Sequence, residues 1–316
     1  MNTQTQAPAL SVVIGVVSDT TGPAHASHLA RCLEAFSGQI DNPPVELIVP
    51  HLEHFGGLEQ VKQDFPKVRF FPVDGLAAPE GGGREHHDVL RAHGLAAARG
   101  DIIALIEDHA KPDPSFCASI LAAHRNTEAA IGGAMDNAVD RPINWAVFFC
   151  DFGKYQNPLP EGDSFFASDA NVSYRKSTLD SIKPEWENSF REVIVNGTLR
   201  TRGIPVRLSQ GIVVYQNRTG LGLAEALRER YIWGRSYAAT RNMQLSGAKR
   251  AIHAILTPIL PVLLTARIGK TAWQRRRLMG RFLRSLHLIF LLQLWWSLGE
   301  GLGYLFGLEH RSGPGA

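Results

Sequence analysis

The chain has 316 residues, so it exceeds one average domain and leaves roughly a hundred residues beyond a single α/β core. Hydrophobic residues make up 44% of the chain and charged residues 20%, a composition that excludes bulk disorder. The net charge of +3 is uneven, because no Asp or Glu lies between Tyr231 and Gly299. The basic residues of this stretch are Arg235, Arg241, Lys249, Arg250, Arg267, Lys270, Arg275, Arg276, Arg277, Arg281 and Arg284. The last third of the chain is therefore expected to face an anionic surface.

The cysteines and the N-terminus indicate the compartment. Cys32, Cys117 and Cys150 are far apart and form no CxxC pair, so neither a disulfide framework nor a zinc site built on cysteines is expected. Residues 1–8 are predicted to be a flexible N-terminus. The opening MNTQTQAPAL has no basic region followed by an apolar one, so no signal peptide is predicted and the first domain is expected in the cytosol.

Strands and helices alternate over the first hundred residues. Strands are expected at Leu10–Val17, Val45–Val49, Val68–Val73 and Asp101–Ile106, and helices at His25–Phe36, Leu58–Asp64 and Glu85–Arg99. This alternation predicts right-handed βαβ units and a parallel sheet. Ligands bind beyond the carboxyl ends of such strands, which is where Ser18-Asp19 and Glu107-Asp108-His109 fall.

A second section, Ala129–Asn217, mixes strands and helices. Strands are expected at Ala129–Met135 and Ile212–Tyr215, with a helix over Phe190–Arg202. The predicted fold class is α/β, with a mixed second half and a helical C-terminal region.

The strongest local signal is RAHGLAAARGDIIALIEDHAKPDP at Arg91–Pro114. Gly94 and Ala96-Ala97-Ala98 allow the helix to lie close to the sheet, and the buried strand then leads into Glu107-Asp108-His109. Carboxylates suit Mg²⁺ or Mn²⁺ bound together with substrate phosphates, and an imidazole favours Mn²⁺. The alternative is a solvated turn with a helix cap at Asp113.

This segment resembles the core of the bacterial family 2 glycosyltransferases. Arg91, Gly94, Ala98 and Gly100 match the family pattern, and Glu107-Asp108-His109 takes the place of its acidic triplet. Three further blocks resemble the family in the same order: LSVVIGVV, FASDANVSYR and FREVIVNGTLRTRG. The four blocks lie within residues 9–220, which are predicted to form the catalytic domain.

The resemblance implies a GT-A-like (Rossmann-like) fold that binds a nucleotide-sugar donor, with a divalent metal ion, Mn or Mg, as cofactor. It implies Glu192 as the general base, with Glu187 close by as an alternative. It further implies donor contacts from Ser18, Asp19, Arg91, Glu107 and Asp108, metal ligands Asp108 and His109, and acceptor or diphosphate contacts from Asn171 and Arg175. Asp19 can alternatively be an acid in a helix N-terminal turn.

Three departures support a rival interpretation. Where the family has acids or a histidine, this chain has Pro50-His51, Glu192-Val193 and Tyr215-Gln216-Asn217. The rival is a catalytically degenerate, membrane-associated binding or scaffold protein on the same fold. A sugar nucleotidyltransferase would need a basic loop at Ser18–Gly22, which has no basic residue. His86-His87 and His93 are too loosely spaced to argue for a metal site and are expected to be exposed.

Residues 221–316 are expected to associate with a membrane. Ala251–Ala266 is apolar but contains Pro258 and Pro261, Leu286–Leu308 is apolar around Glu300, and the link Arg267–Arg284 holds seven basic residues. A spanning first segment would place this link outside, against the positive-inside tendency. The pattern favours segments lying on the cytoplasmic face of the inner (plasma) membrane. A spanning pair, or a hairpin packed on the domain or a second copy, remains an alternative.

The acceptor is expected to be lipid-linked or a polysaccharide precursor. No QxxRW motif is present, which favours transfer of single sugars. Nucleic acid is not expected as a partner, because the chain has no recognised nucleic-acid-binding motif.

Overall fold

The computed structural model describes residues 8–21, 26–41, 43–79, 82–126, 128–242 and 245–307. The predicted flexible N-terminus, residues 1–8, lies outside these ranges except for its last residue. The chain divides into two compact units, the first formed by residues 1–80, 85–139 and 155–218, and the second by residues 81–84, 140–154 and 219–316. This division falls close to the predicted boundary at residue 220, but residues 140–154 belong to the second unit.

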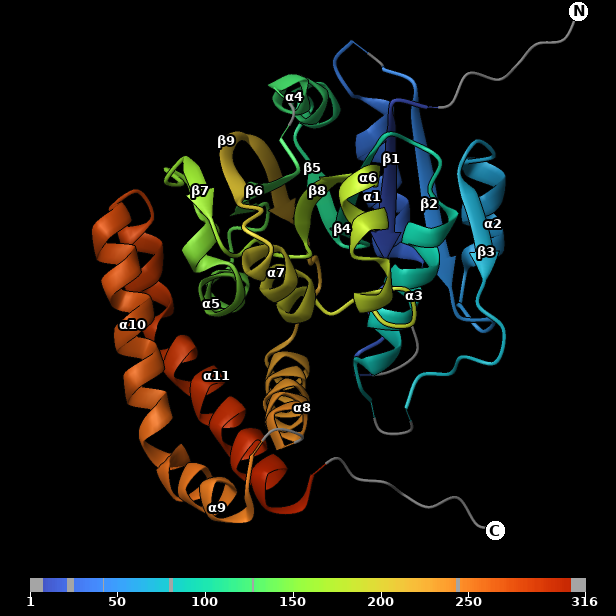
Figure 1. Cartoon of the computed structure of the whole chain (residues 1–316). Coiled ribbons are helices and arrows are strands. Elements are labelled where there is room, and N and C mark those ends of the chain that lie inside the picture. The colour runs from blue at the N-terminus through green and yellow to red at the C-terminus, as the bar shows by residue number, and fades with distance from the viewer. Residues whose placement is uncertain are drawn as a thin grey trace, which may run out of the picture. The chain divides into compact units, whose positions relative to one another are not determined.

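The first unit is built on one sheet (Figure 1). Within the described residues it has nine strands: β1 (Leu10–Gly15), β2 (Val45–His51), β3 (Arg69–Pro72), β4 (Ile102–Glu107), β5 (Ala110–Pro112), β6 (Ala130–Asn137), β7 (Gly162–Ser164), β8 (Asn171–Arg175) and β9 (Val206–Gln216). Their order is β3-β2-β1-β4-β8-β6-β9-β5, and β7 pairs with β9. The helices of this unit are α1 (Ser27–Ser37), α2 (Leu58–Asp64), α3 (Glu85–Ala97), α4 (Phe116–Ala123), α6 (Lys176–Ser181) and α7 (Glu192–Thr201).

The first four strands of the sheet, β1 to β4, are parallel, as the alternation of strands and helices predicts. Every residue of β1 and β4 is buried, which explains their continuous apolar sequences LSVVIG and IIALIE. Their register pairs Gly15 with Glu107, so both strands end at the same edge of the sheet.

The second half of the sheet is mixed. Strand β8 runs antiparallel to β4 and to β6, whereas β6 and β9 are parallel, with a register shift between Gly133 and Ala134. The structure therefore confirms the predicted α/β class, with a parallel first half, a mixed second half and a helical C-terminal region.

Helix α3 lies close to the sheet at a glycine. A Cβ atom at Gly94 would lie 2.3 Å from Cγ1 of Val13 in β1 and 3.2 Å from Cγ of Pro50 in β2. Any larger residue would force the helix away from the strands. Of the small residues predicted at this contact, Ala98 is also buried, whereas Ala96 is exposed.

The second unit is helical. Its elements are α5 (Pro142–Asp151), α8 (Leu223–Asn242), α9 (Gly247–Leu256), the 3₁₀ turn η4 (Thr257–Ile259), α10 (Leu260–Arg275) and α11 (Met279–Phe306). Pro258 and Pro261 stand at the starts of η4 and α10, where proline removes no hydrogen bond that a helix needs. Helices α10 and α11 contact each other, and α11 also contacts α5 and α8 (Figure 1).

Glycines bring the backbones of α8 and α11 together. A Cβ atom at Gly234 would lie 2.2 Å from the Trp296 carbonyl oxygen, and one at Gly299 would lie 2.1 Å from the Tyr231 carbonyl oxygen. Glu300, the acid within the apolar sequence, accepts hydrogen bonds from Nε1 of Trp296 at 2.8 Å and the hydroxyl of Tyr304 at 3.1 Å. Its carboxylate is therefore satisfied inside the helical unit.

Two helical segments are long and apolar enough to cross a membrane by length and composition, residues Gly247–Arg275 and Met279–Phe306. Only 11% of the apolar window in the first segment is buried, against 44% in the second. Most apolar side chains of the first segment are therefore exposed, among them Ile255, Val262 and Trp273.

Candidate functional site

The predicted triplet, Glu107-Asp108-His109, lies at the carboxyl edge of the parallel strands. The amide of Asp108 donates to the Gly15 carbonyl oxygen at 2.9 Å, which holds the end of β4 beside the end of β1. The side chain of Asp108 is fully buried, with Oδ1 accepting from the amide of Val17 at 3.2 Å and Oδ2 from Oγ of Ser18 at 2.5 Å. The segment after β1 and the end of β4 thus meet at Asp108, as the sequence predicts.

His109 lies between the two preceding carboxylates. Its Nδ1 is 3.4 Å from Oδ1 of Asp108, and its Nε2 is 3.2 Å from Oε2 of Glu107. Burial lowers the pKa of His109, but hydrogen bonds and charges from Asp108 and Glu107 outweigh burial and raise the pKa to about 9. Burial raises the pKa values of both acids, but the interaction with His109 brings them below their ordinary range. At neutral pH the triplet is therefore two carboxylates around an imidazolium.

Arg91 on α3 extends this network. Its buried guanidinium places Nη2 3.6 Å from Oε1 of Glu107 and 3.1 Å from Oδ2 of Asp169, and Nη1 3.3 Å from Oδ1 of Asp88. The amide of Asp169 in turn donates to Oε2 of Glu192 at 3.0 Å. Predicted site residues from separate sequence blocks therefore join in one polar network.

Asp169 and Asp88 were not singled out from the sequence. For Asp169 the available signal was its place as the acid of the FASDANVSYR block, whereas Asp88 precedes the block that begins at Arg91. The network as a whole holds five carboxylates and two cations, the carboxylates being Asp88, Glu107, Asp108, Asp169 and Glu192.

The predicted metal ligands Asp108 and His109 are bonded to protein groups in this structure. Both ring nitrogens of His109 face carboxylate oxygens, so the ring would have to release a proton and turn from one of them to bind a metal ion. Both oxygens of Asp108 already accept hydrogen bonds from the segment after β1. No chemical step is therefore assigned below to an ion at these two residues.

Asp19 lies among histidines. Its Oδ1 is 2.5 Å from Nε2 of His87 and its Oδ2 is 2.9 Å from Nε2 of His86. The prediction that His86 and His87 are exposed is wrong: they are 2% and 3% exposed, because the first turn of α3 packs on the segment after β1. Burial raises the pKa of Asp19, but both histidines lower it to about 2, and burial lowers the pKa of His87 to about 4.

Asn171 and Arg175 lie at opposite ends of β8. Asn171 pairs with Ile106 at the carboxyl end of β4, where its buried Nδ2 donates to the carbonyl oxygens of Ala134 at 2.8 Å and Ile212 at 3.1 Å. Arg175 pairs with Ile102 at the opposite end of β4 and donates to the His124 carbonyl oxygen. Asn171 thus ties β8 to β6 and β9, and the predicted contact of Arg175 with acceptor or diphosphate is not supported by its position.

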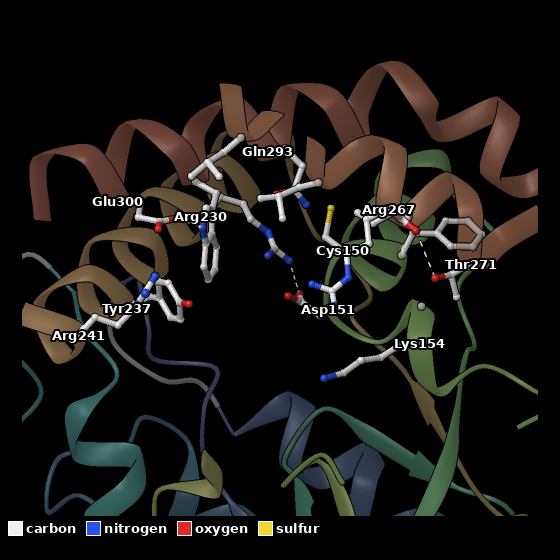
Figure 2. A pocket seen from close by; sticks show the side chains of 16 residues that line it. Cys150, Asp151, Lys154, Arg230, Tyr237, Arg241, Arg267, Thr271, Gln293 and Glu300 are labelled. Atoms are coloured by element: carbon white, nitrogen blue, oxygen red, sulfur yellow. Dashed lines mark hydrogen bonds and ion pairs between the residues drawn. The ribbon is translucent and has the colours of Figure 1, made fainter. Parts of the chain in front are cut away.

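The second unit contains its own cavity of about 560 Å³. Figure 2 shows side chains of α5, α8, α10 and α11 around it, with the Arg230 guanidinium directed at Asp151, its ion-pair partner. Charged side chains in the lining are Asp151, Lys154, Arg230, Arg241, Arg267 and Glu300, and apolar ones include Leu260, Leu264 and Ile268. Four cations thus face two carboxylates beside an apolar wall.

Comparison with known proteins finds structural similarities but no sequence match. No protein-family model matches the chain, and no curated protein matches it. The crystal structure of S. aureus TarS 1-349 is similar, with a TM-score of 0.49 and 11% sequence identity over 96% of this chain and 93% of that chain. At this score and identity the similarity assigns neither a family nor an activity.

Proposed function

We propose that the chain is a glycosyltransferase of the GT-A type that transfers a sugar from a nucleotide-sugar donor. The observation that carries this proposal is the convergence of four family-like sequence blocks in one network. The amide of Val17 bonds to Asp108, Arg91 pairs with Glu107 and Asp169, and the amide of Asp169 bonds to Glu192. An accidental match of four weak motifs gives no reason for their polar residues to meet.

Glu192 is the proposed general base. The acceptor hydroxyl oxygen forms a bond to the anomeric carbon, the bond from that carbon to the diphosphate oxygen breaks, and the hydroxyl proton passes to the Glu192 carboxylate. The amide of Asp169 orients this carboxylate by donating to Oε2 at 3.0 Å. Glu192 is also the first residue of α7 and is half-buried, so its position is set by the fold.

Donor binding is proposed to depend on Mn²⁺ or Mg²⁺. The network contains more carboxylates than cations, so an anionic diphosphate is expected to bind together with a divalent ion. The proposed donor contacts are Ser18, Arg91, Glu107 and Asp108. Asp19 is bonded to two histidines, which makes its direct contact with the donor the least supported of the set.

We further propose that the second unit associates with the cytoplasmic face of the inner membrane and that the acceptor is lipid-linked. The exposed apolar side chains of α9 and α10 support association with lipid, and the basic residues from Arg267 to Arg284 favour anionic headgroups. The cavity in this unit offers cations for a phosphate group and an apolar wall for a lipid chain. These are the two chemical parts of a lipid-linked acceptor.

A screen tests the activity. Full-length protein in detergent is incubated with a panel of nucleotide sugars and Mn²⁺, and release of the nucleoside diphosphate is measured. Wild type is expected to release it slowly to water and faster with a suitable acceptor. Glu192→Gln should keep donor affinity and reduce turnover by roughly 100-fold or more, because an amide cannot take a proton.

The matched control is Glu187→Gln, which changes an exposed acid paired with Lys183 at 3.8 Å and should leave turnover unchanged. Loss of turnover in Glu187→Gln with activity retained in Glu192→Gln would move the base to Glu187. Tight donor binding with no release by wild type would favour the non-catalytic binding protein instead. Absence of donor binding would contradict both readings.

A further inference from the structure

Asp19, His86 and His87 form a buried group whose metal-ligating atoms converge. The three residues are 3%, 2% and 3% exposed, and one ligand atom from each lies within 4.8 Å of the other two. Asp19 comes from the segment after β1, whereas both histidines come from the first turn of α3, 67 and 68 residues further along. The fold therefore brings three metal-ligating side chains from two segments to one point.

The directions of the ring nitrogens distinguish this group from the triplet at the end of β4. In the triplet, the two nitrogens of the His109 ring face two different carboxylates. As these atoms lie, one ion cannot contact the ring and both carboxylates. Here, two rings face one carboxylate through the same kind of atom, Nε2. Among the described residues, Asp19, His86 and His87 are the group of three whose ligand atoms all lie within 4.8 Å of one another.

We propose that Asp19, His86 and His87 bind one divalent first-row transition-metal ion in the absence of nucleotide. Imidazole nitrogens with a carboxylate suit Zn²⁺ and its neighbours better than Mg²⁺, which takes oxygen ligands. Each ring binds through the Nε2 lone pair with its proton on Nδ1, so a proton now on Nε2 moves or is released. Three protein ligands leave a fourth tetrahedral position for water.

The ion positions the segment after β1. It ties Asp19 to the start of α3, and the preceding residue, Ser18, donates to Oδ2 of Asp108 at 2.5 Å. An ion held at Asp19 therefore fixes the residue that contacts the triplet at the end of β4. This site is independent of the proposed sugar transfer, because it requires neither nucleotide nor acceptor.

Metal binding to the full-length protein tests the site. Chelator-treated protein is titrated with Zn²⁺ by calorimetry without nucleotide, and bound metal is measured after dialysis. Wild type is expected to bind one ion per chain and to gain thermal stability as Zn²⁺ is added, because the ion binds the folded state. The double variant His86→Gln, His87→Gln should bind roughly tenfold more weakly or worse and lose the thermal shift.

The matched control is His93→Gln, on the same helix but exposed, which should bind as wild type does. A second variant, His109→Gln, distinguishes the Asp19 group from the triplet at the end of β4. This variant should keep Zn²⁺ binding, and loss of Zn²⁺ binding in it would overturn the proposal. Wild-type affinity in the double variant, or no bound ion in wild type, would also overturn it. If the double variant fails to fold, the Zn²⁺-dependent thermal shift of His93→Gln and His109→Gln still decides between the groups.

Discussion

Nη2 of Arg91 lies 3.1 Å from Oδ2 of Asp169, which joins the helix before β4 to the segment before β8. The two residues are 78 positions apart in the sequence and belong to separate family-like blocks. Arg91 is 3% exposed and pairs with further carboxylates on Glu107 and Asp88. One buried cation therefore compensates acids from three parts of the first unit.

Arg91→Met is expected to destabilise the fold. Removing the cation takes an ion-pair partner from Asp88, Glu107 and Asp169, and breaking a buried ion pair costs about 3–5 kcal/mol in comparable cases. Thermal unfolding of the full-length protein measures the effect. Lys176→Met is the control, because its pair with Asp180 is exposed and contributes about 0.5 kcal/mol or less. Equal melting temperatures for Arg91→Met and wild type would show that Arg91 does not stabilise the network.

Asp108→Asn is expected to abolish metal-dependent binding of a nucleoside diphosphate. The amide keeps the shape of the side chain but removes one negative charge and one of the acceptors that serve Ser18 and Val17. Calorimetry with and without Mn²⁺ measures the affinity. Asp113→Asn is the control, because Asp113 bonds to Ser115 in the following turn. Wild-type affinity in Asp108→Asn would remove this residue from the donor site.

The raised pKa of His109 predicts that the folded protein becomes less stable at alkaline pH. Its pKa is about 9 in the folded protein and about 6.5 in an unfolded chain, so its contribution is fully present below pH 6.5. That contribution, up to about 3 kcal/mol, is lost as the pH rises towards 9. Melting temperatures from pH 6 to 10 should fall more steeply for wild type than for His109→Gln. Parallel curves would mean that His109 is not an imidazolium between its two acids.

The basic residues at the junction of α10 and α11 are expected to hold the protein on anionic membranes. Replacing Arg275, Arg276 and Arg277 with Gln should weaken binding to anionic vesicles by roughly 1 kcal/mol per charge and make it less salt-sensitive. Flotation with vesicles at two salt concentrations measures this. If the helices span the bilayer, the triple substitution will scarcely change retention and salt will extract nothing.

The control for this experiment is a second triple variant in the first unit. Lys176, Lys183 and Arg207 are exposed cations there, and their replacement with Gln removes the same charge. It should leave vesicle binding unchanged. An equal loss in both variants would show that net charge, rather than the α10–α11 junction, determines binding.

The sequence was informative where structure is local and buried. The runs LSVVIG and IIALIE predict β1 and β4 because buried parallel strands need continuous apolar residues. Because these parallel strands end at the same edge of the sheet, Ser18 and Asp108, which follow them, meet there. The alternation of strands and helices likewise predicts the parallel half of the sheet.

The errors concern direction and long-range packing. Because β8 runs antiparallel to β4, only its first residue, Asn171, reaches the carboxyl edge of β4, and Arg175 lies at the other end. Nothing in NVSYR specifies that direction. The burial of His86 and His87 depends on which face of α3 meets the segment after β1, and helix periodicity alone does not identify that face.

Helix α5 belongs to the second unit although it is encoded in the middle of the chain. Its Phe149 ring packs edge-on against Phe282 of α11, with centroids 5.5 Å apart, and Arg281 lies over Trp145. During synthesis α5 therefore leaves the ribosome well over a hundred residues before α11, and the apolar face that packs on α11 stays uncovered until α11 emerges. This unit therefore cannot be completed before α11 has been synthesised. A chain cut before α8 would keep that face exposed permanently, and we expect it to aggregate.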